Sequence, residues 1–219
     1  MHGTGMAAQC AAPRIYQHRE ILGNHGMKTV IGLTGAYCAG KNAAAAFLES
    51  TGWYTIDLDK LGHKALEMAR GSVIELLGEF IINANGTLDR KKIAEQVFSN
   101  PSLLTRYEAI VHPVMFTLLD DAIEQAPSQK VCINAAILYK IPHVSRCTVI
   151  IEIQSLFIVR LLRGIRRDKR SVRDVLNKML AQYKLFANRP DSIPIIKIYN
   201  IGTITCLEKK IAYVLSHFT

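Results

Sequence analysis

The sequence lacks the features that mark a membrane, secreted or disordered protein. No apolar run reaches the ~18 residues that a membrane-spanning helix needs, so we expect no membrane association. Residues 1–26 contain no apolar stretch of signal-peptide length. Hydrophobic residues make up 49% and charged residues 21% of the 219 residues, which excludes a disordered chain. These absences favour a globular protein of the cytoplasm.

Cysteine is sparse and unpatterned. The five cysteines are scattered along the chain, and none forms a C-x-x-C pair. That distribution argues against a zinc site and against a disulfide framework. It is typical of a reducing compartment.

Short apolar segments alternate with helical patterns along most of the chain. This alternation predicts an α/β fold, with a parallel five-stranded sheet and helices on both faces. The expected strands are 29–34, 54–57, 131–138, 148–153 and 195–199, and the expected helices are 42–50, 60–80, 89–98, 101–125, 155–187 and 205–217. We predict a disordered tail over 1–26 and one domain over 27–219, with a helical insertion at 60–125 and a basic region at 155–187.

A phosphate-binding motif follows the first expected strand. The segment from Gly35 to Lys41 reads G-x-x-x-x-G-K, between a strand and a helix. Backbone N–H groups of such a loop cradle phosphate oxygens, and the lysine places a positive charge on them. A chance Gly-Lys pair in a strand–helix turn is the alternative. The expected ATP-binding residues are Gly35, Cys38, Ala39, Gly40, Lys41, Asn42 and Ala43.

Asn42 and Cys38 are unusual residues for a phosphate-binding loop. Asn42 stands where a hydroxyl residue usually coordinates Mg²⁺, and an amide oxygen can also ligate that ion but from a longer arm. We therefore expect Mg²⁺ as a cofactor, with weakened positioning at Asn42. Cys38 lies near helix-terminal amides and Lys41, which predicts a lowered pKa for its thiol. A space-filling role for Cys38 is the alternative.

Two carboxylates follow the second expected strand. Asp57 and Asp59 lie at its carboxyl end, where ligands bind in open α/β sheets. One carboxylate could accept a proton from a substrate hydroxyl, and the other could hold Mg²⁺ through water. A solvated loop end is the alternative.

A basic run occupies residues 159–184, with nine Lys or Arg against two Asp. Arg160, Arg163, Arg167 and Arg170 are spaced to share one helix face, beside an apolar stripe of Ile158, Leu161, Leu162 and Ile165. Such a face could close on ATP as a lid and neutralise the transferring phosphoryl group. A solvated basic helix is the alternative. Few aromatic residues accompany the run and no nucleic-acid motif is present, which argues against nucleic acid as a partner.

Together these motifs resemble the dephospho-CoA kinase family. The resemblance rests on Gly32–Gly35, Gly40-Lys41 and Ile56–Lys60, and further on Phe80, Gly86–Arg90, Val97-Phe98, Ile110–Pro113, the basic helix and Gln182. It implies transfer of the ATP γ-phosphoryl group to the ribose 3′-hydroxyl of dephospho-CoA, which forms CoA. It also implies that Asp59 is the general base, that Lys41, Arg163 and Arg167 are catalytic, and that 60–125 binds the acceptor, with Asp57, Arg90 and His112 as candidate contacts.

The chain also departs from the family pattern. The phosphate loop ends Lys41-Asn42-Ala43 rather than Lys-Ser-Thr, and the family's P-L-L-[FV]-E segment reads Ala136–Lys140. A catalytically weakened nucleotide-binding relative, another phosphate-loop nucleoside or nucleotide kinase, and a basic nucleic-acid-binding protein are the alternatives. The oligomeric state does not follow from the sequence.

Overall fold

The computed structural model describes residues 28–169, 171–183, 186 and 189–217, so the expected tail at 1–26 lies outside the described residues. The chain divides into two compact units. We call Asp57–Gln125 the helical unit, and the remainder, Met1–Ile56 with Ala126–Thr219, the sheet unit.

A five-stranded sheet with the strand order β2-β3-β1-β4-β5 organises the sheet unit. Its strands are β1 (Thr29–Gly35), β2 (Tyr54–Asp57), β3 (Lys130–Asn134), β4 (Val149–Gln154) and β5 (Ile195–Tyr199). The pairs β1–β3, β1–β4 and β4–β5 are parallel. The expected α/β fold with a parallel five-stranded sheet is confirmed.

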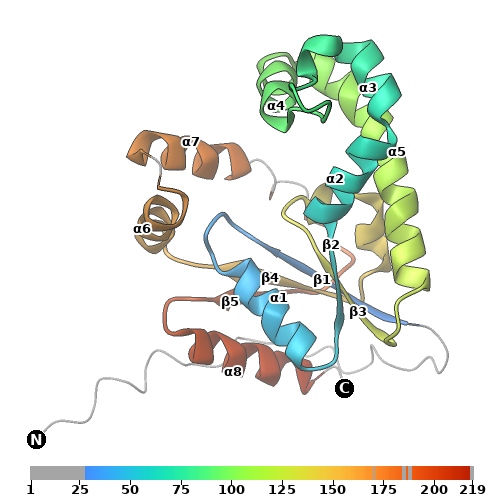
Figure 1. Ribbon diagram of the computed structural model, residues 1–219. Helices are drawn as coiled ribbons and strands as arrows, with labels where there is room; N and C mark the ends of the chain where they lie inside the picture. Colours follow the sequence, from blue (N-terminus) through green and yellow to red (C-terminus); the bar gives the residue numbers. More distant parts are fainter. Residues whose placement is uncertain (1–27, 170, 184–185, 187–188, 218–219) are drawn as a thin grey trace, which may run out of the picture. The chain divides into compact units, whose positions relative to one another are not determined.

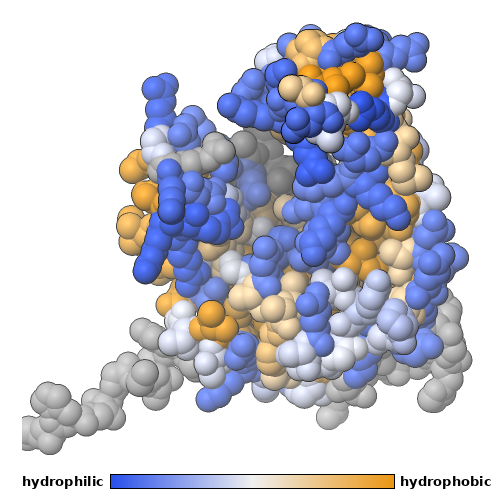
Figure 2. Space-filling model, in the orientation of Figure 1, coloured by the Kyte–Doolittle hydropathy of each residue, from blue (hydrophilic) through white to orange (hydrophobic). Residues whose placement is uncertain are grey.

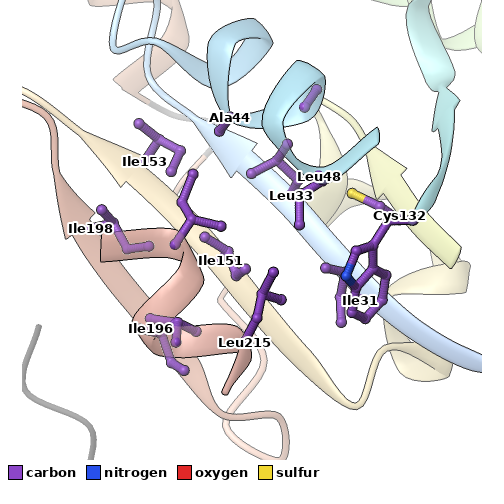
Figure 3. Close-up of a cluster of buried hydrophobic side chains, with 14 of the residues drawn as sticks. Ile31, Leu33, Ala44, Leu48, Cys132, Ile151, Ile153, Ile196, Ile198 and Leu215 are labelled. Carbon is purple, nitrogen blue, oxygen red and sulfur yellow. The ribbon is translucent and has the colours of Figure 1, made fainter. Parts of the chain in front are cut away.

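Strand β1 is central and almost entirely buried. Its alternate residues Ile31 and Leu33 pack against α1 (Lys41–Ser50) and α8 (Ile204–Leu215), in a core that includes Leu48, Ile151 and Ile211. Figure 3 shows members of this core, among them Leu33, Leu48 and Ile151, between the sheet and the two helices. Because β1 is covered on both faces, its residues are buried continuously from Val30 to Gly35 rather than in alternation.

The opposite face of β1 meets the short 3₁₀-helix η3 (Leu138–Lys140) and Cys147, the residue after a second 3₁₀-helix, η4 (Pro142–Arg146). A Cβ atom on Gly32 would lie 2.6 Å from Leu138 Cδ2 and 3.2 Å from Cys147 Sγ. The predicted strand 131–138 was therefore too long: β3 ends at Asn134, and Leu138 belongs to the layer that covers the sheet. An apolar run alone does not distinguish a strand from a short covering helix.

The basic region forms two helices rather than the single expected one. They are α6 (Phe157–Asp168) and α7 (Val172–Tyr183), and Figure 1 shows them as neighbours. Lys169 at the end of α6 has a φ of 49°, a left-handed conformation that ends the helix. Arg170, expected on the same face as Arg160, Arg163 and Arg167, lies outside the described residues.

The helical unit contains α2 (Leu58–Met68), α3 (Arg70–Leu77), η2 (Glu79–Ile81), α4 (Arg90–Ser99) and α5 (Pro101–Glu124). Polar N-caps begin three of these helices: Asp57 caps α2, Asp89 caps α4 and Asn100 caps α5, each by accepting backbone N–H bonds. The predicted helix 60–80 is divided at Ala69, whose backbone lies between α2 and α3. The long helix α5 packs against α2 and α4.

Among the described cysteines, Cys38, Cys132 and Cys147 are free thiols. Cys206 is disulfide-bonded, so the expectation of reduced cysteines is wrong at that position. Within the described part of the chain, no helix is long and apolar enough to cross a membrane.

We expect Leu33→Ala to lower the free energy of unfolding by about 3 kcal/mol, because truncation leaves a cavity in a fully buried position. Urea unfolding monitored by circular dichroism measures this change. Leu180→Ala, at a side chain 66% exposed on α7, is the matched control and should change the free energy by less than about 1 kcal/mol. Equal losses in the two variants would contradict the assigned core.

Candidate active site

The phosphate loop joins the carboxyl end of β1 to the first turn of α1. Cys38 and Gly40 have positive φ values of 57° and 107°, and the N–H of Ala39 donates to the carbonyl of Ala36 at 2.9 Å. Gly40 is the N-cap of α1 and supplies no side-chain cap. The first N–H groups of α1 therefore face no N-cap oxygen and can bind an anion.

Asn200, the residue that follows β5, makes a hydrogen bond to this loop. Its Nδ2 donates to the carbonyl of Ala39 at 2.8 Å, and the side chain is buried. A Cβ atom on Gly40 would lie 2.3 Å from that same Nδ2. Two features therefore favour glycine at position 40. Its positive φ is unfavourable for other residues, and Asn200 occupies the space that a Cβ atom would need.

Lys41 begins α1 and extends toward β3. Its Nζ donates a hydrogen bond to Oδ1 of Asn134, the last residue of β3. Asn134 is buried and its backbone lies opposite Leu33 in the parallel pairing of β1 with β3. The lysine ammonium is thereby held at the carboxyl edge of the sheet, beside the loop. Asn42 is exposed on α1 and Ala43 is half-buried.

The helices α6 and α7 contact the loop through Tyr37. The Tyr37 N–H donates to Oε1 of Gln182 at 2.6 Å, and the Tyr37 hydroxyl donates to Oδ2 of Asp168. Burial and the hydrogen bond to Asp168 raise the pKa of Tyr37 to about 12. The structure therefore ties the loop to the basic helices at two points.

Arg167 is the candidate catalytic arginine that lies at this junction. Its guanidinium stands 5.0 Å from the centre of the Tyr37 ring, a cation–π distance, and its Nε donates to Asp168 at 2.8 Å. Lys178 also donates to Asp168, at 3.0 Å. Hydrogen bonds from Arg167, Tyr37 and Lys178 lower the pKa of Asp168, which stays ionised.

Side chains on α6 differ in how far they are exposed to solvent. Arg163 is half-buried on the same helix as Arg167. The expected apolar stripe is partly exposed, since Ile158 and Leu162 both face solvent. Figure 2 shows orange side chains next to the blue ones in the region of α6 and α7.

Cys38 does not have the lowered pKa that was predicted. Burial of the thiol raises its pKa and outweighs the positive charge of Arg167. The proximity of helix N–H groups is therefore insufficient to activate this cysteine.

A buried carboxylate lies one strand away from the loop. Glu152 on β4 is opposite Thr34 of β1, and its side chain is fully buried. It accepts hydrogen bonds from Arg189 at 2.8 and 3.0 Å, from the Tyr139 hydroxyl at 2.7 Å, and from Gln154. Burial raises the pKa of Glu152, but these hydrogen bonds outweigh burial and the pKa is lowered.

The remaining predicted site residues belong to the helical unit. Asp57 ends β2 and caps α2, where its Oδ1 accepts from the N–H of Asp59 at 3.0 Å. Asp59 is exposed in the first turn of α2, and Arg90 is exposed at the start of α4. His112 stacks near Phe116 at 5.5 Å within α5, which continues through Pro113.

The residues in the sheet unit do not match the usual magnesium site of a phosphate-loop enzyme. Such sites use a hydroxyl after the loop lysine and an acidic residue at the end of a neighbouring strand. Here Asn42 follows Lys41, and Asn134 ends β3. Among the described residues, no group of three or more His, Cys, Asp or Glu side chains could hold a metal ion.

Sequence reasoning missed three of these contacts. Asn134 as the partner of Lys41, Tyr37 as the link to Asp168, and the pairing of Glu152 with Arg189 each join residues more than 30 positions apart. The available signal was one polar residue, Asn134, inside the apolar run 131–138.

The chain is similar to known proteins over most of its length. Residues 29–192 match the model of the dephospho-CoA kinase family. The dephospho-CoA kinase of Treponema denticola is 30% identical over 182 residues, which cover 78% of this chain and 81% of that protein. The dephospho-CoA kinase of Borrelia garinii is 31% identical over 191 residues, which cover 83% and 90%.

Solved structures agree with the fold. The crystal structure of TT1252 from Thermus thermophilus has a TM-score of 0.77 and 28% identity, and the match covers 88% of this chain and 99% of that one. Dephospho-CoA kinase from Campylobacter jejuni has a TM-score of 0.58 at 18% identity, covering 89% and 99%, and shows the shared fold.

We expect Gly40→Ala to weaken ATP binding about tenfold or more. The new methyl group would collide with Asn200, and alanine is strained at the φ of 107° that residue 40 adopts. Isothermal titration calorimetry measures the dissociation constant. Gly52→Ala is the matched control: its φ is 89°, and its Cβ would meet nothing within 4 Å. Equal affinity in the two variants would contradict a phosphate-binding role for the loop.

We expect Glu152→Gln to destabilise the protein by about 2 kcal/mol at pH 7, because charged hydrogen bonds to Arg189 are lost. The lowered pKa means that this stabilisation is present above the unfolded value of 4.5 and is lost as the pH falls through the folded value. The difference between variant and wild type in urea unfolding should therefore shrink in acid. Glu95→Gln, on an exposed pair with Lys91, is the control. A difference that is constant with pH would refute the assignment.

Proposed function

The chain belongs to the dephospho-CoA kinase family, and from this premise we propose that it transfers the γ-phosphoryl group of ATP to the ribose 3′-hydroxyl of dephospho-CoA. The product would be CoA. The observation that carries the proposal is the loop itself: an uncapped helix start with Lys41 at the sheet edge, tied to Arg167 through Tyr37 and Asp168.

Each part of this arrangement suits one step of phosphoryl transfer. Loop N–H groups and Lys41 would hold the triphosphate, because both present positive charge to phosphate oxygens. Arg163 and Arg167 would neutralise charge on the transferring group from α6. The region of α6 and α7 would then serve as a lid that excludes water.

Acceptor activation is assigned to the helical unit. Asp59 is exposed at the start of α2, so its carboxylate can accept the proton of a substrate hydroxyl. Asp57 already uses Oδ1 to cap α2, which favours Asp59 over Asp57 as the base. Asp57, Arg90 and His112 are the proposed contacts to dephospho-CoA.

Mg²⁺ is the proposed companion of ATP, bound mainly to the nucleotide's own phosphates. Bound Mg²⁺ would neutralise phosphate charge during transfer. Asn42 and Asp57 stay the predicted protein ligands, and an amide at position 42 would contribute little. The cytoplasm stays the predicted compartment: the free thiols at Cys38, Cys132 and Cys147 support it, whereas the disulfide bond at Cys206 does not.

A second candidate function is nucleotide binding with feeble transfer. Amides at Asn42 and Asn134, and Lys140 in place of the family's glutamate, favour it. Tight ATP binding without ADP release in the presence of dephospho-CoA would select this alternative.

We expect ADP release to depend on dephospho-CoA, and Asp59→Asn to lower kcat about 100-fold with little change in KM for ATP, because only proton removal is lost. Lys41→Ala should lower both kcat and the affinity for ATP. A coupled ADP assay measures these constants. Glu67→Gln, an exposed acid on the same helix α2, is the matched control. Full activity in Asp59→Asn would remove that residue as the base.

A further inference from the structure

We propose that Tyr37 is a positioning residue for phosphoryl transfer: its ring and its hydroxyl hold the guanidinium of Arg167 in a fixed orientation at the phosphate loop. This role rests on the proposed function, in which Arg167 neutralises the transferring phosphoryl group. It adds a residue of the loop that acts on the reaction through the arginine and not through a contact with the nucleotide.

The ring of Tyr37, the third residue of the G-x-x-x-x-G-K motif, packs directly against α6. A Cβ atom on Gly164, which is buried in that helix, would lie 2.9 Å from Tyr37 Cε1 and 2.7 Å from Cγ1 of Val175 on α7. The absence of a side chain at Gly164 therefore lets α6 approach both the tyrosine ring and α7. The loop reaches the two basic helices through this side chain as well as through the backbone N–H that donates to Gln182.

Two separate contacts join Tyr37 to Arg167. The guanidinium carbon stands 5.0 Å from the centre of the ring, a distance at which the negative face of an aromatic ring attracts a cation. The Tyr37 hydroxyl donates to Oδ2 of Asp168, and Oδ1 of the same carboxylate accepts from Arg167 Nε at 2.8 Å. Burial and the hydrogen bond to Asp168 raise the pKa of Tyr37 to about 12, so at neutral pH the hydroxyl keeps the proton that it donates.

These contacts orient the end of the guanidinium that would meet phosphate oxygens. The hydrogen bond to Asp168 uses Nε, and the two Nη groups carry the four other N–H donors of Arg167. The side chain is 58% exposed, so without the ring it would sample many rotamers. A planar guanidinium held on a ring face presents its donors in a restricted direction. Donors that are already oriented stabilise the charge of the transition state without a further ordering cost.

Lys178 of α7 belongs to the same cluster. Its Nζ lies 5.5 Å from the centre of the Tyr37 ring and donates to Asp168 at 3.0 Å. Hydrogen bonds from Arg167, Tyr37 and Lys178 lower the pKa of Asp168, so the cluster contains two cations and one ionised carboxylate. A cluster of positive net charge beside the phosphate loop suits a triphosphate.

The test is a double-mutant cycle on the full chain with Tyr37→Leu, Arg167→Ala and the double variant. We expect Tyr37→Leu to lower kcat about tenfold and to leave the dissociation constant of ATP within about threefold of the wild type, because only the orientation of Arg167 is lost. When Arg167→Ala is already present, adding Tyr37→Leu should lower kcat by less than about twofold. A coupled ADP assay with dephospho-CoA and isothermal titration calorimetry measure these constants.

Two further variants serve as controls. Tyr37→Phe keeps the ring and loses the hydroxyl, so we expect it to lower kcat about threefold, which is less than Tyr37→Leu. Tyr213→Leu makes the same exchange at a tyrosine of α8 whose ring contacts His217, and it should change neither kcat nor ATP affinity.

A wild-type kcat in Tyr37→Leu would overturn the inference. So would an equal loss of kcat from Tyr37→Leu with and without Arg167, or a loss that weaker ATP binding explains entirely. If Tyr37→Leu does not fold, Tyr37→Phe is compared in the same two backgrounds, and an equal loss in both overturns the inference.

A wild type that does not phosphorylate dephospho-CoA would refute the proposed function, and urea unfolding of the wild type and the three variants then decides the contact by itself. We expect the combined effect of Tyr37→Leu and Arg167→Ala on the unfolding equilibrium constant to be at least about threefold smaller than the product of the single effects. Independent effects would show that Tyr37 does not hold Arg167.

Discussion

The site depends on the burial of one strand. β1 lies in the middle of the sheet between β3 and β4, and it is buried from Val30 to Gly35, so packing determines where its carboxyl end lies. The loop that follows is then fixed at three points: Asn200 holds the carbonyl of Ala39, Asn134 holds Lys41, and Gln182 holds the N–H of Tyr37. The three contacts come from different parts of the sheet unit, and all of them depend on where β1 places the start of the loop.

Hydrogen bonds set the charge state of two acidic side chains in the sheet unit. Asp168 and Glu152 are both surrounded by donors, which lower their pKa values and keep them ionised. Lys41 donates to the amide oxygen of Asn134, and the buried Nε of Arg160 has no hydrogen-bond partner among the described residues. The Lys41 ammonium and the loop N–H groups lie side by side, where a polyphosphate would bind.

Much of the fold followed from local patterns. Strands 54–57 and 195–199 have their predicted bounds, and the start of the phosphate loop at Gly35 is where the motif placed it. The errors share a cause. The strand predicted at 131–138 is an apolar run, and where β3 ends within it depends on packing. The helix predicted at 155–187 is an amphipathic run, and it is interrupted at one left-handed residue, Lys169. Local periodicity in the sequence does not indicate how a segment packs or which residue adopts a left-handed conformation.

The sequence by itself determined the class of the site: glycines, a lysine and strand-end acids of the types that phosphoryl transfer uses, in an order that resembles one family. Tertiary structure alone decided which partner each of these residues has. Asn134, Tyr37 and Glu152 acquire their roles from residues distant in the chain, and the pKa of Cys38 is raised by burial, not lowered by its neighbours in sequence. Spacing along the chain specifies which groups are available, whereas their charge and burial depend on what the fold packs against them.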